Sequence, residues 1–407
     1  MAESVFQLKC YCNSYPWGRK GSSSLAARLC ANTPGTDFKI NENEIYSEMW
    51  MGNYPDVPAY VLSTSETLED HLKAQSHKLI GPAIESRFGH GNLPFLPKII
   101  SIAKALPLQI HPNKALAAAL HEREPSRFTD PNHKPEIAIA LSTFRAFVGF
   151  KPCEVIEKLF SDVEPIKVFL PEIKKPKFCD QIVKHIVRQI LQASDETIQE
   201  VSDELLEVPK EAFGEEPYIL ELLPELRKQY DKTDPGHLVA LLTMNFVELP
   251  PGGCICIPAD GIHAYLSGDI MEVMARSNNM LATGFCPGPE RDRVHTFVSV
   301  LSFSPHNADD AMIEPAPFEG SAKTLLYKPP IVEFNVLKTK LEKGESEKIR
   351  GLGGPSVLIV IHGGGKLKAD GKEHKLDEGY SYFVGYDVET VFEAGTDGLE
   401  VFRAYLE

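Results

Sequence analysis

The strongest constraint on the fold is a helical block with β-like sequence on both sides. Between about 152 and 244, apolar residues recur at helical spacing, as in the run from Ile182 to Leu191. Ser194 follows where the N-cap of a next helix belongs. The segments before and after this block instead carry short apolar runs between turns rich in glycine, proline and asparagine. This order predicts one β domain that is interrupted by a helical insertion.

We therefore predict a mainly β protein with a helical insertion. Residues 1–151 and 245–319 would form a discontinuous β domain, a jelly roll of the cupin type, and residues 152–244 would form the helical domain. Residues 320–407 would form a second, smaller, cupin-like β domain, because strand-like runs such as SVLIVIHGGG return there. The segments PPGGCICIPADGIHAY and LDEGYSYFVGYDVET share a turn, strand, turn rhythm that is typical of cupins.

Two local patterns set expectations for individual strands. Pro97 and Pro107 predict short, interrupted strands within residues 95–111, because proline cannot donate to a sheet. The SGD sequence at 267–269 predicts a hairpin turn between two apolar strands.

Charge and apolar patterning exclude several kinds of partner. A formal net charge of -15 opposes binding to nucleic acid or to an anionic membrane, because such binding depends on clustered lysine and arginine. No run approaches the roughly 18 to 20 apolar residues that span a bilayer, and MAESVFQLKC lacks the pattern of a signal peptide. We expect a soluble, cytoplasmic monomer with no nucleic-acid or membrane partner.

The cysteines allow two interpretations. The chain has eight, including two C-x-C pairs, Cys10 with Cys12 and Cys254 with Cys256. Two such pairs are able to form a four-thiolate zinc site. Alternate residues of a strand also share one face, so ordinary core packing explains each pair equally well. Without a secretion signal, reduced thiols are expected rather than disulfides.

Three short segments carry candidate metal ligands. LQIHP places Gln109 and His111 two apart, so both point to one face of an extended segment. In NHKPE, the proline favours extended geometry, which puts Lys134 and Glu136 on one face. HAYLSGDIMEVM places His263 at a position that often lines a barrel mouth. Each segment alone also fits a core histidine or a solvated ion pair. Together they offer a ligand set compatible with Zn²⁺.

Longer segments make the chain resemble a known family. FLPKIISIAKALPLQIHPNK, DPNHKPEIAIAL with FVGFKP, and GIHAYLSGDIMEVMARSNN are similar to signature segments of type I mannose-6-phosphate isomerases, in the same order and on both sides of a helical insertion. YPWG around Trp17 and SEMWMGNYP around Trp50 match as well. The resemblance implies one Zn²⁺ per chain, with the ligands Gln109, His111, Glu136 and His263.

The same resemblance implies an intramolecular oxidoreductase that interconverts mannose 6-phosphate and fructose 6-phosphate, in the supply of GDP-mannose. The discontinuous β domain would then be catalytic. By their place in matching motifs, Glu272 and Lys134 are candidates for the proton shuttle and its electrostatic partner. The expected substrate-binding residues are Trp17, Glu48, Lys98 and Tyr265.

The chain departs from the family pattern at three positions. Ala282 stands where an active-site arginine is common, Gly288 replaces a lysine, and Pro107 replaces a serine. Arg276, six residues before Ala282, would share its face on a regular strand, and we expect it to take over part of the arginine's catalytic role. The alternative is that Arg276 is a solvated surface charge.

The departures leave a second function open, a catalytically weakened protein that binds sugar phosphates on the same scaffold. A third is a cupin-fold oxygenase or epimerase with a different metal. The last domain has His362 and His374 apart from any carboxylate cluster, so we expect it to be structural.

Overall fold

The main β domain is a ten-stranded sheet that carries all the predicted metal ligands. The computed structural model describes residues 3–171 and 180–407, and every strand pair in these ranges is antiparallel. The strands of this sheet are β2 (Tyr11–Asn13), β5 (Glu48–Trp50), β7 (Phe95–Ile102), β8 (Leu108–Ile110), β9 (Glu136–Ala140), β10 (Phe144–Phe150), β11 (Met244–Leu249), β12 (Cys254–Ile257), β13 (His263–Ala275) and β14 (Leu281–Gly284).

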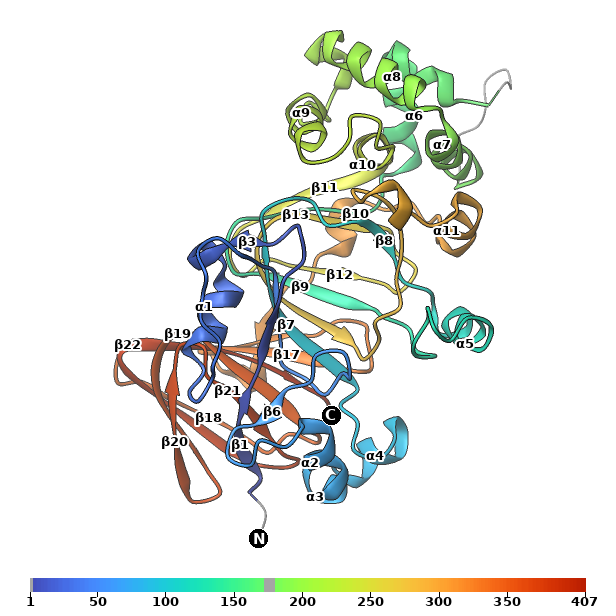
Figure 1. Cartoon of the computed structure of the whole chain (residues 1–407). Helices are drawn as coiled ribbons and strands as arrows, with labels where there is room; N and C mark the ends of the chain where they lie inside the picture. Colours follow the sequence, from blue (N-terminus) through green and yellow to red (C-terminus); the bar gives the residue numbers. More distant parts are fainter. Residues whose placement is uncertain (1–2, 172–179) are drawn as a thin grey trace.

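A second ten-stranded sheet lies beside the first and takes in two strands from the N-terminal region, β1 and β6, which the sequence did not assign to it (Figure 1). Its strands are β1 (Val5–Lys9), β6 (Tyr60–Val61), β15 (Ala316–Pro317), β16 (Thr324–Tyr327), β17 (Asn335–Leu341), β18 (Ser346–Ile349), β19 (Ser356–Ala369), β20 (Lys372–Asp377), β21 (Ser381–Val384) and β22 (Thr390–Tyr405). A small ribbon joins β3 (Arg19–Lys20) to β4 (Ile45–Tyr46).

Helices α6 to α10 lie together at one end of the molecule, between β10 and β11 in the sequence, so the predicted helical insertion is confirmed (Figure 1). Residues 172–179 of this block lie outside the described residues. The helices are α1 (Leu25–Asn32), α2 (Leu68–Ala74), α3 (Ser76–Leu79), α4 (Pro82–Phe88), α5 (Lys114–Arg123), α6 (Cys153–Asp162), α7 (Asp180–Gln192), α8 (Asp195–Glu207), α9 (Ile219–Gln229), α10 (Gly236–Thr243) and α11 (Val294–Val300). None of these described helices is long and apolar enough to cross a membrane.

Strand alternation separates a packing face from a polar face in the first sheet. Ile137 and Met271 point toward the second sheet and share a buried core with its Phe402. Their neighbours Glu136 and Glu272 point to the opposite face, because successive side chains of a strand alternate. The two sheets therefore pack through one face of the first sheet, and the other face carries polar side chains.

Pro97 does not interrupt its strand, so that prediction is wrong. Strand β7 runs through it, with Pro97 opposite Val273 of β13. The carbonyl of Pro97 accepts a hydrogen bond from Met51, just past the end of β5, on the side where proline's missing N–H would also point. Because β5 has ended at this point, no neighbouring strand requires the N–H that proline lacks, so Pro97 is tolerated within β7. Pro107 does lie between β7 and β8, as predicted.

The SGD sequence is not a hairpin turn, because β13 continues through it. The register against β10 shifts between Tyr265 and Ser267, and Gly268 has a φ of 121°. Beyond this irregularity β13 leaves β10 and pairs with β7 and β9. His263 and Glu272 are an odd number of residues apart, so on a regular strand they would face opposite sides. The shift puts both on the polar face.

We predict that Gly268→Ala lowers the free energy of unfolding by about 2–4 kcal/mol, because an added Cβ would lie 2.7 Å from the Thr143 carbonyl oxygen in addition to the positive φ. Gly371→Ala is the matched control, since Gly371 also has a positive φ, 71°, but open space around it. Thermal denaturation of both variants tests this. Equal destabilisation would show that the packing around Gly268 does not matter.

Candidate metal centre and cavity

Three buried side chains converge on one point of the polar face. The His263 Nε2 and Glu136 Oε1 atoms are 2.9 Å apart, and His111 Nε2 lies 3.6 Å from Glu136 Oε2. Over residues 3–171 and 180–407 this is the only group of three or more His, Cys, Asp or Glu side chains whose ligand atoms all lie within 4.8 Å of one another. The prediction that these three residues form a potential metal site is thus confirmed.

Neighbouring strands bring the cluster together. Glu136 begins β9, His263 begins β13, and His111 directly follows β8. Gln109, the predicted fourth ligand, lies opposite His263 in the β8–β13 pair, so the two side chains share a face. Gln109 also lines the large cavity in front of the sheet.

Backbone carbonyls fix which nitrogen of each histidine is free. The Nδ1 of His111 lies 2.8 Å from the Asn279 carbonyl oxygen, and that of His263 lies 3.0 Å from the Gly261 oxygen. A carbonyl only accepts, so each Nδ1 carries a proton and each Nε2 is the nitrogen that faces Glu136. Burial, with the nearby Lys134 charge, lowers the pKa of His111 to about 4, which keeps that ring neutral.

The cluster fits a cation, because its members are all acceptors. His263 Nε2 and Glu136 Oε2 are buried and make no hydrogen bond. Burial alone would raise the pKa of Glu136, but the Lys134 ammonium, 3.3 Å away, helps to hold it well below the ordinary range. Lone pairs of neutral histidine and carboxylate repel at these distances unless a cation lies between them. Two imidazoles with a carboxylate and an amide oxygen suit Zn²⁺.

The two C-x-C pairs pack in or against the core between the sheets and do not form a metal site. Cys10, Cys30 and Cys254 lie in the apolar core between the sheets, with Cys12 and Cys256 packed against it. All cysteines of the described ranges are free thiols, and none belongs to a potential metal group. Burial raises the pKa of Cys30 to about 12, so its thiol stays protonated. The core-packing interpretation holds for these pairs.

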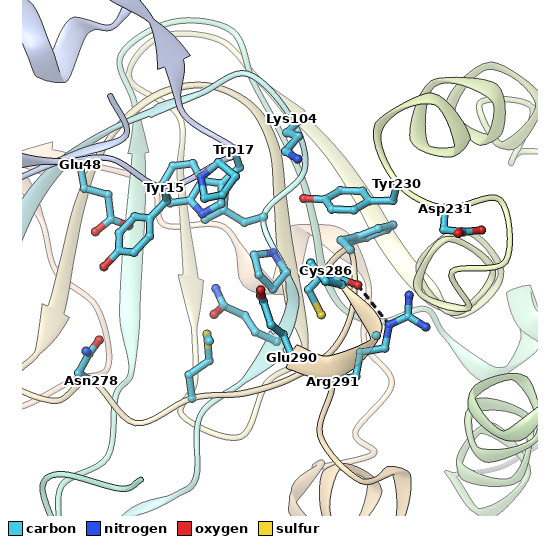
Figure 2. A pocket seen from close by; sticks show the side chains of 18 of the residues that line it. Tyr15, Trp17, Glu48, Lys104, Tyr230, Asp231, Asn278, Cys286, Glu290 and Arg291 are labelled. Atoms are coloured by element: carbon cyan, nitrogen blue, oxygen red, sulfur yellow. Dashed lines mark hydrogen bonds between the residues drawn. The ribbon is translucent and has the colours of Figure 1, made fainter. Parts of the chain in front are cut away.

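A cavity of about 850 Å³ opens beside the cluster, between the polar face of the sheet and the helical insertion; Gln109 and Lys134 line it, whereas His111, Glu136 and His263 are fully buried behind its wall (Figure 2). Lys98, 3% exposed, lies in its wall with Nζ at 3.3 Å from Glu48 and 3.4 Å from Glu272. Burial opposes the charge of Lys98, but these two carboxylates outweigh it and raise its pKa. Burial raises the pKa of Glu272 to about 7, with the Glu136 charge adding to the effect.

Most of the predicted substrate-binding residues line this cavity. Trp17 stacks on Tyr15 with ring centroids 5.6 Å apart at its mouth, and Glu48 accepts a hydrogen bond from Trp50 Nε1. Tyr265 is different, because it is fully buried and absent from the cavity lining. Its hydroxyl donates to Glu136 Oε1 at 3.0 Å, so in the structure it orients the carboxylate of the cluster.

Comparison with known proteins assigns the chain to a family. Residues 5–153 match the family model "Phosphomannose isomerase type I, catalytic domain", and residues 324–372 match "Phosphomannose isomerase type I C-terminal". The chain is 37% identical to the mannose-6-phosphate isomerase of Cryptococcus neoformans and 33% identical to that of Saccharomyces cerevisiae, over 100% of each chain in both cases. The chain belongs to the type I phosphomannose isomerases. The predicted family and enzyme class, an intramolecular oxidoreductase, are thereby confirmed.

The fold of the family agrees with a solved structure. The mannose 6-phosphate isomerase of Salmonella typhimurium, solved bound to its substrate F6P and to zinc, superposes with a TM-score of 0.82 at 24% identity, covering 100% of both chains. This likeness confirms the predicted fold class, mainly β with a helical insertion.

Arg276 and Ala282 do not lie on one strand. Arg276 follows the end of β13, whereas Ala282 lies on the separate strand β14, so the premise that the two share a strand is wrong. The Arg276 guanidinium lies 5.3 Å from the centre of the Tyr54 ring, with Nη2 at 3.5 Å from the Asn53 carbonyl oxygen. Arg276 is absent from the cavity lining. Its catalytic role remains a prediction that this position does not support.

Sequence reasoning missed several residues of the cavity. Lys104, Tyr230, Glu290 and Arg291 all line it, and Figure 2 shows them around one end. Tyr230 comes from the helical insertion, where the sequence pattern predicted helices and no site residue. The charged turn GPERDR after β14 was a signal for Arg291, because charged loops next to a sheet edge often carry binding residues.

We predict that Tyr265→Phe weakens zinc binding about 10- to 100-fold, because it removes the donor that orients Glu136. Competition with a chromophoric zinc chelator measures this affinity. Tyr327→Phe is the control, since its buried hydroxyl donates to the Gly252 carbonyl oxygen away from the cluster. Equal affinities for wild type and Tyr265→Phe would show that the hydrogen bond does not support the site.

Proposed function

We propose that the chain is a zinc-dependent aldose–ketose isomerase that interconverts mannose 6-phosphate and fructose 6-phosphate. The observation that carries the proposal is the group of buried acceptor side chains at His111, Glu136 and His263, which adjoins a cavity lined by Gln109, Lys134 and Glu272. Family membership supports the reaction, and the size of the cavity suits a phosphorylated hexose.

Gln109, His111, Glu136 and His263 hold the ion in this proposal. A bound Zn²⁺ supplies positive charge for the sugar oxygens at C1 and C2, where negative charge develops. Lys134 adds a second positive charge at the same place, since its Nζ lies 3.4 Å from His111 Nε2 as well as close to Glu136. Its ammonium orients the open-chain sugar and stabilises the enediol-like intermediate.

Glu272 moves the proton between C1 and C2. The carboxyl faces the cavity from β13, and a pKa near neutrality lets one group take a proton and return it. Lys98 holds this carboxyl in place from the facing strand β7. The proton removed from one carbon is delivered to its neighbour and the hydroxyl proton moves between the oxygens at C2 and C1, so the isomerisation balances without an outside acid.

The remaining wall binds the sugar. Trp17 and Tyr15 offer an aromatic platform at the mouth, and Glu48 with Lys98 offers an acceptor and a donor for hydroxyl groups. The substrate is thus a phosphorylated hexose, and supplying mannose 6-phosphate for GDP-mannose synthesis in the cytoplasm is the proposed place of the reaction. The chain acts as a monomer, with no nucleic acid or membrane as partner.

One observation favours a second function, binding of sugar phosphates without efficient turnover. Pro107 and Gly288 line the cavity at positions where the family commonly has polar residues, and Ala282 is buried where it commonly has arginine. Against this, the chain keeps the acceptor cluster, Glu272 and Lys134. An abandoned site would be free to lose them.

A coupled assay of mannose 6-phosphate conversion to fructose 6-phosphate separates the two functions. We expect turnover that is lost when the protein is treated with a chelator and returns when zinc is restored. Folded, zinc-loaded protein without turnover would support the binding function. Turnover that survives complete removal of the metal would contradict zinc dependence.

We predict that Glu272→Gln lowers kcat about 100- to 10,000-fold, because an amide cannot take the proton. Zinc content should stay at the wild-type level, since Glu272 is not a ligand in this account. Glu248→Gln, which changes an exposed glutamate on β11, is the control. A Glu272→Gln enzyme with wild-type kcat would assign the proton transfer to another group.

A further inference from the structure

One end of the cavity, the end that faces the helical insertion, carries two cations around an aromatic ring (Figure 2). The Nζ of Lys104 lies 4.8 Å from the centre of the Tyr230 ring, which in turn lies 5.8 Å from the Phe285 ring. Arg291, at the end of the short 3₁₀ turn Gly288–Glu290, donates from Nε to the Cys286 carbonyl oxygen at 3.2 Å. We call Lys104, Tyr230 and Arg291 the cationic end.

Carboxylates already neutralise the other cations of the cavity. Lys98 is held between Glu48 and Glu272, and Lys134 lies against Glu136. In the described part of the chain, Lys104 has no carboxylate oxygen within 4.0 Å. A doubly charged ligand group therefore finds its least compensated positive charge at the cationic end.

Arg291 retains N–H groups that can donate to a ligand, although its guanidinium already forms an ion pair. Its Nη2 lies 2.9 Å from Asp234 Oδ2, and its Nε serves the Cys286 carbonyl. A guanidinium carries five N–H groups, so three remain for a ligand, in a planar fork that suits phosphate. Asp234 is itself anchored by the backbone N–H of Gly236 at the start of α10. It acts as a positioning residue that aims Arg291 from the helical insertion.

The backbone ties Arg291 to the strand where the expected arginine is missing. Asp292, the next residue, donates from its N–H to the Ala282 carbonyl oxygen at 2.7 Å and accepts from the Ala282 N–H at 2.9 Å. Ala282 in turn lies opposite Gln109 of β8. The backbone at Arg291 therefore lies about one strand spacing from Ala282 and two strand spacings from Gln109, a candidate metal ligand. Two strand spacings amount to about 10 Å. The open chain of a hexose phosphate has a comparable length.

We propose that Lys104 and Arg291 bind the phosphate of the substrate, with Arg291 supplying from the turn after β14 the positive charge that Ala282 and Gly288 do not. The inference rests on the proposed function. It sets the direction of the sugar in the cavity, with C1 and C2 at the His111–Glu136–His263 cluster and the phosphate at the cationic end. It also makes the helical insertion part of substrate binding, through Tyr230 and Asp234.

For Glu290, the proposal predicts an effect on substrate binding that is opposite to the effect of Lys104 and Arg291. Its carboxylate lines the same end of the cavity and repels a phosphate dianion. Asp231 lies nearby, but its Oδ1 already accepts hydrogen bonds from the Thr233 N–H and hydroxyl. Loss of the Glu290 charge should therefore tighten binding of the phosphorylated sugar.

The test measures KM and kcat for mannose 6-phosphate, and inhibition by inorganic phosphate, on zinc-loaded wild type, Lys104→Ala, Arg291→Ala, Arg291→Lys and Glu290→Gln. We expect KM to rise on the order of 10-fold in each alanine variant, with kcat within about 2-fold of wild type, because uniform binding is lost. The inhibition constant of inorganic phosphate should rise in parallel. Arg291→Lys should recover part of the loss, and Glu290→Gln should lower KM.

The control variants remove two cationic side chains that have comparable neighbours but lie outside the cavity. Lys338 also lies over an aromatic ring, that of Phe402, and Arg145 is a half-buried arginine with carboxylate partners. Lys338→Ala and Arg145→Ala should keep wild-type KM. If Arg291→Ala does not fold because Asp234 loses its partner, Lys104→Ala and Arg291→Lys still decide the question.

The outcomes distinguish the inference from the proposed function. An inactive, zinc-loaded wild type would overturn the proposed function and the inference with it. Active wild type with unchanged KM and unchanged phosphate inhibition in Lys104→Ala and the Arg291 variants would overturn the inference alone. In that case the Arg291–Asp234 pair is only a link between the insertion and β14.

Discussion

The arrangement depends on one buried electrostatic constraint, a carboxylate that faces the Nε2 atoms of two buried imidazoles. Glu136 presents lone pairs to His111 and His263 in a place that water does not reach. Such a cluster is unfavourable by itself, and Lys134 relieves it only in part. Binding of a cation would offset the unfavourable free energy of burying these acceptors together. The Asn279 and Gly261 carbonyls orient both imidazole rings for such binding, because they accept hydrogen bonds from the Nδ1 atoms.

The two-sheet architecture makes this constraint possible. The face of the first sheet toward the second is apolar and supplies the stability, so the opposite face is free to carry Lys98, Glu136 and Glu272. The irregular stretch of β13 around Gly268 lets one strand contribute both a candidate ligand, His263, and the proposed proton carrier. Tyr230, Asp231 and Thr233 of the helical insertion then line the cavity from the other side.

Sequence predicted what depends on local pattern and missed what depends on long-range packing. Alternation and family motifs located the metal cluster, and helical spacing located the insertion. The pairing of β1 with the last sheet, the continuity of β7 through Pro97 and the partner change within β13 were not predictable, because each depends on strands distant in sequence. For the same reason Lys104 and Arg291 escaped notice. Nothing in either segment shows that both line the same cavity.

X-ray absorption at the zinc edge of the protein as purified tests the central claim most directly, because it reports which atoms surround the metal. The account predicts one zinc per chain bound only by nitrogen and oxygen, at about 2.0–2.2 Å. A sulfur contribution at about 2.3 Å would instead place zinc on the cysteines, and protein that holds no zinc after metal is supplied would contradict the account altogether.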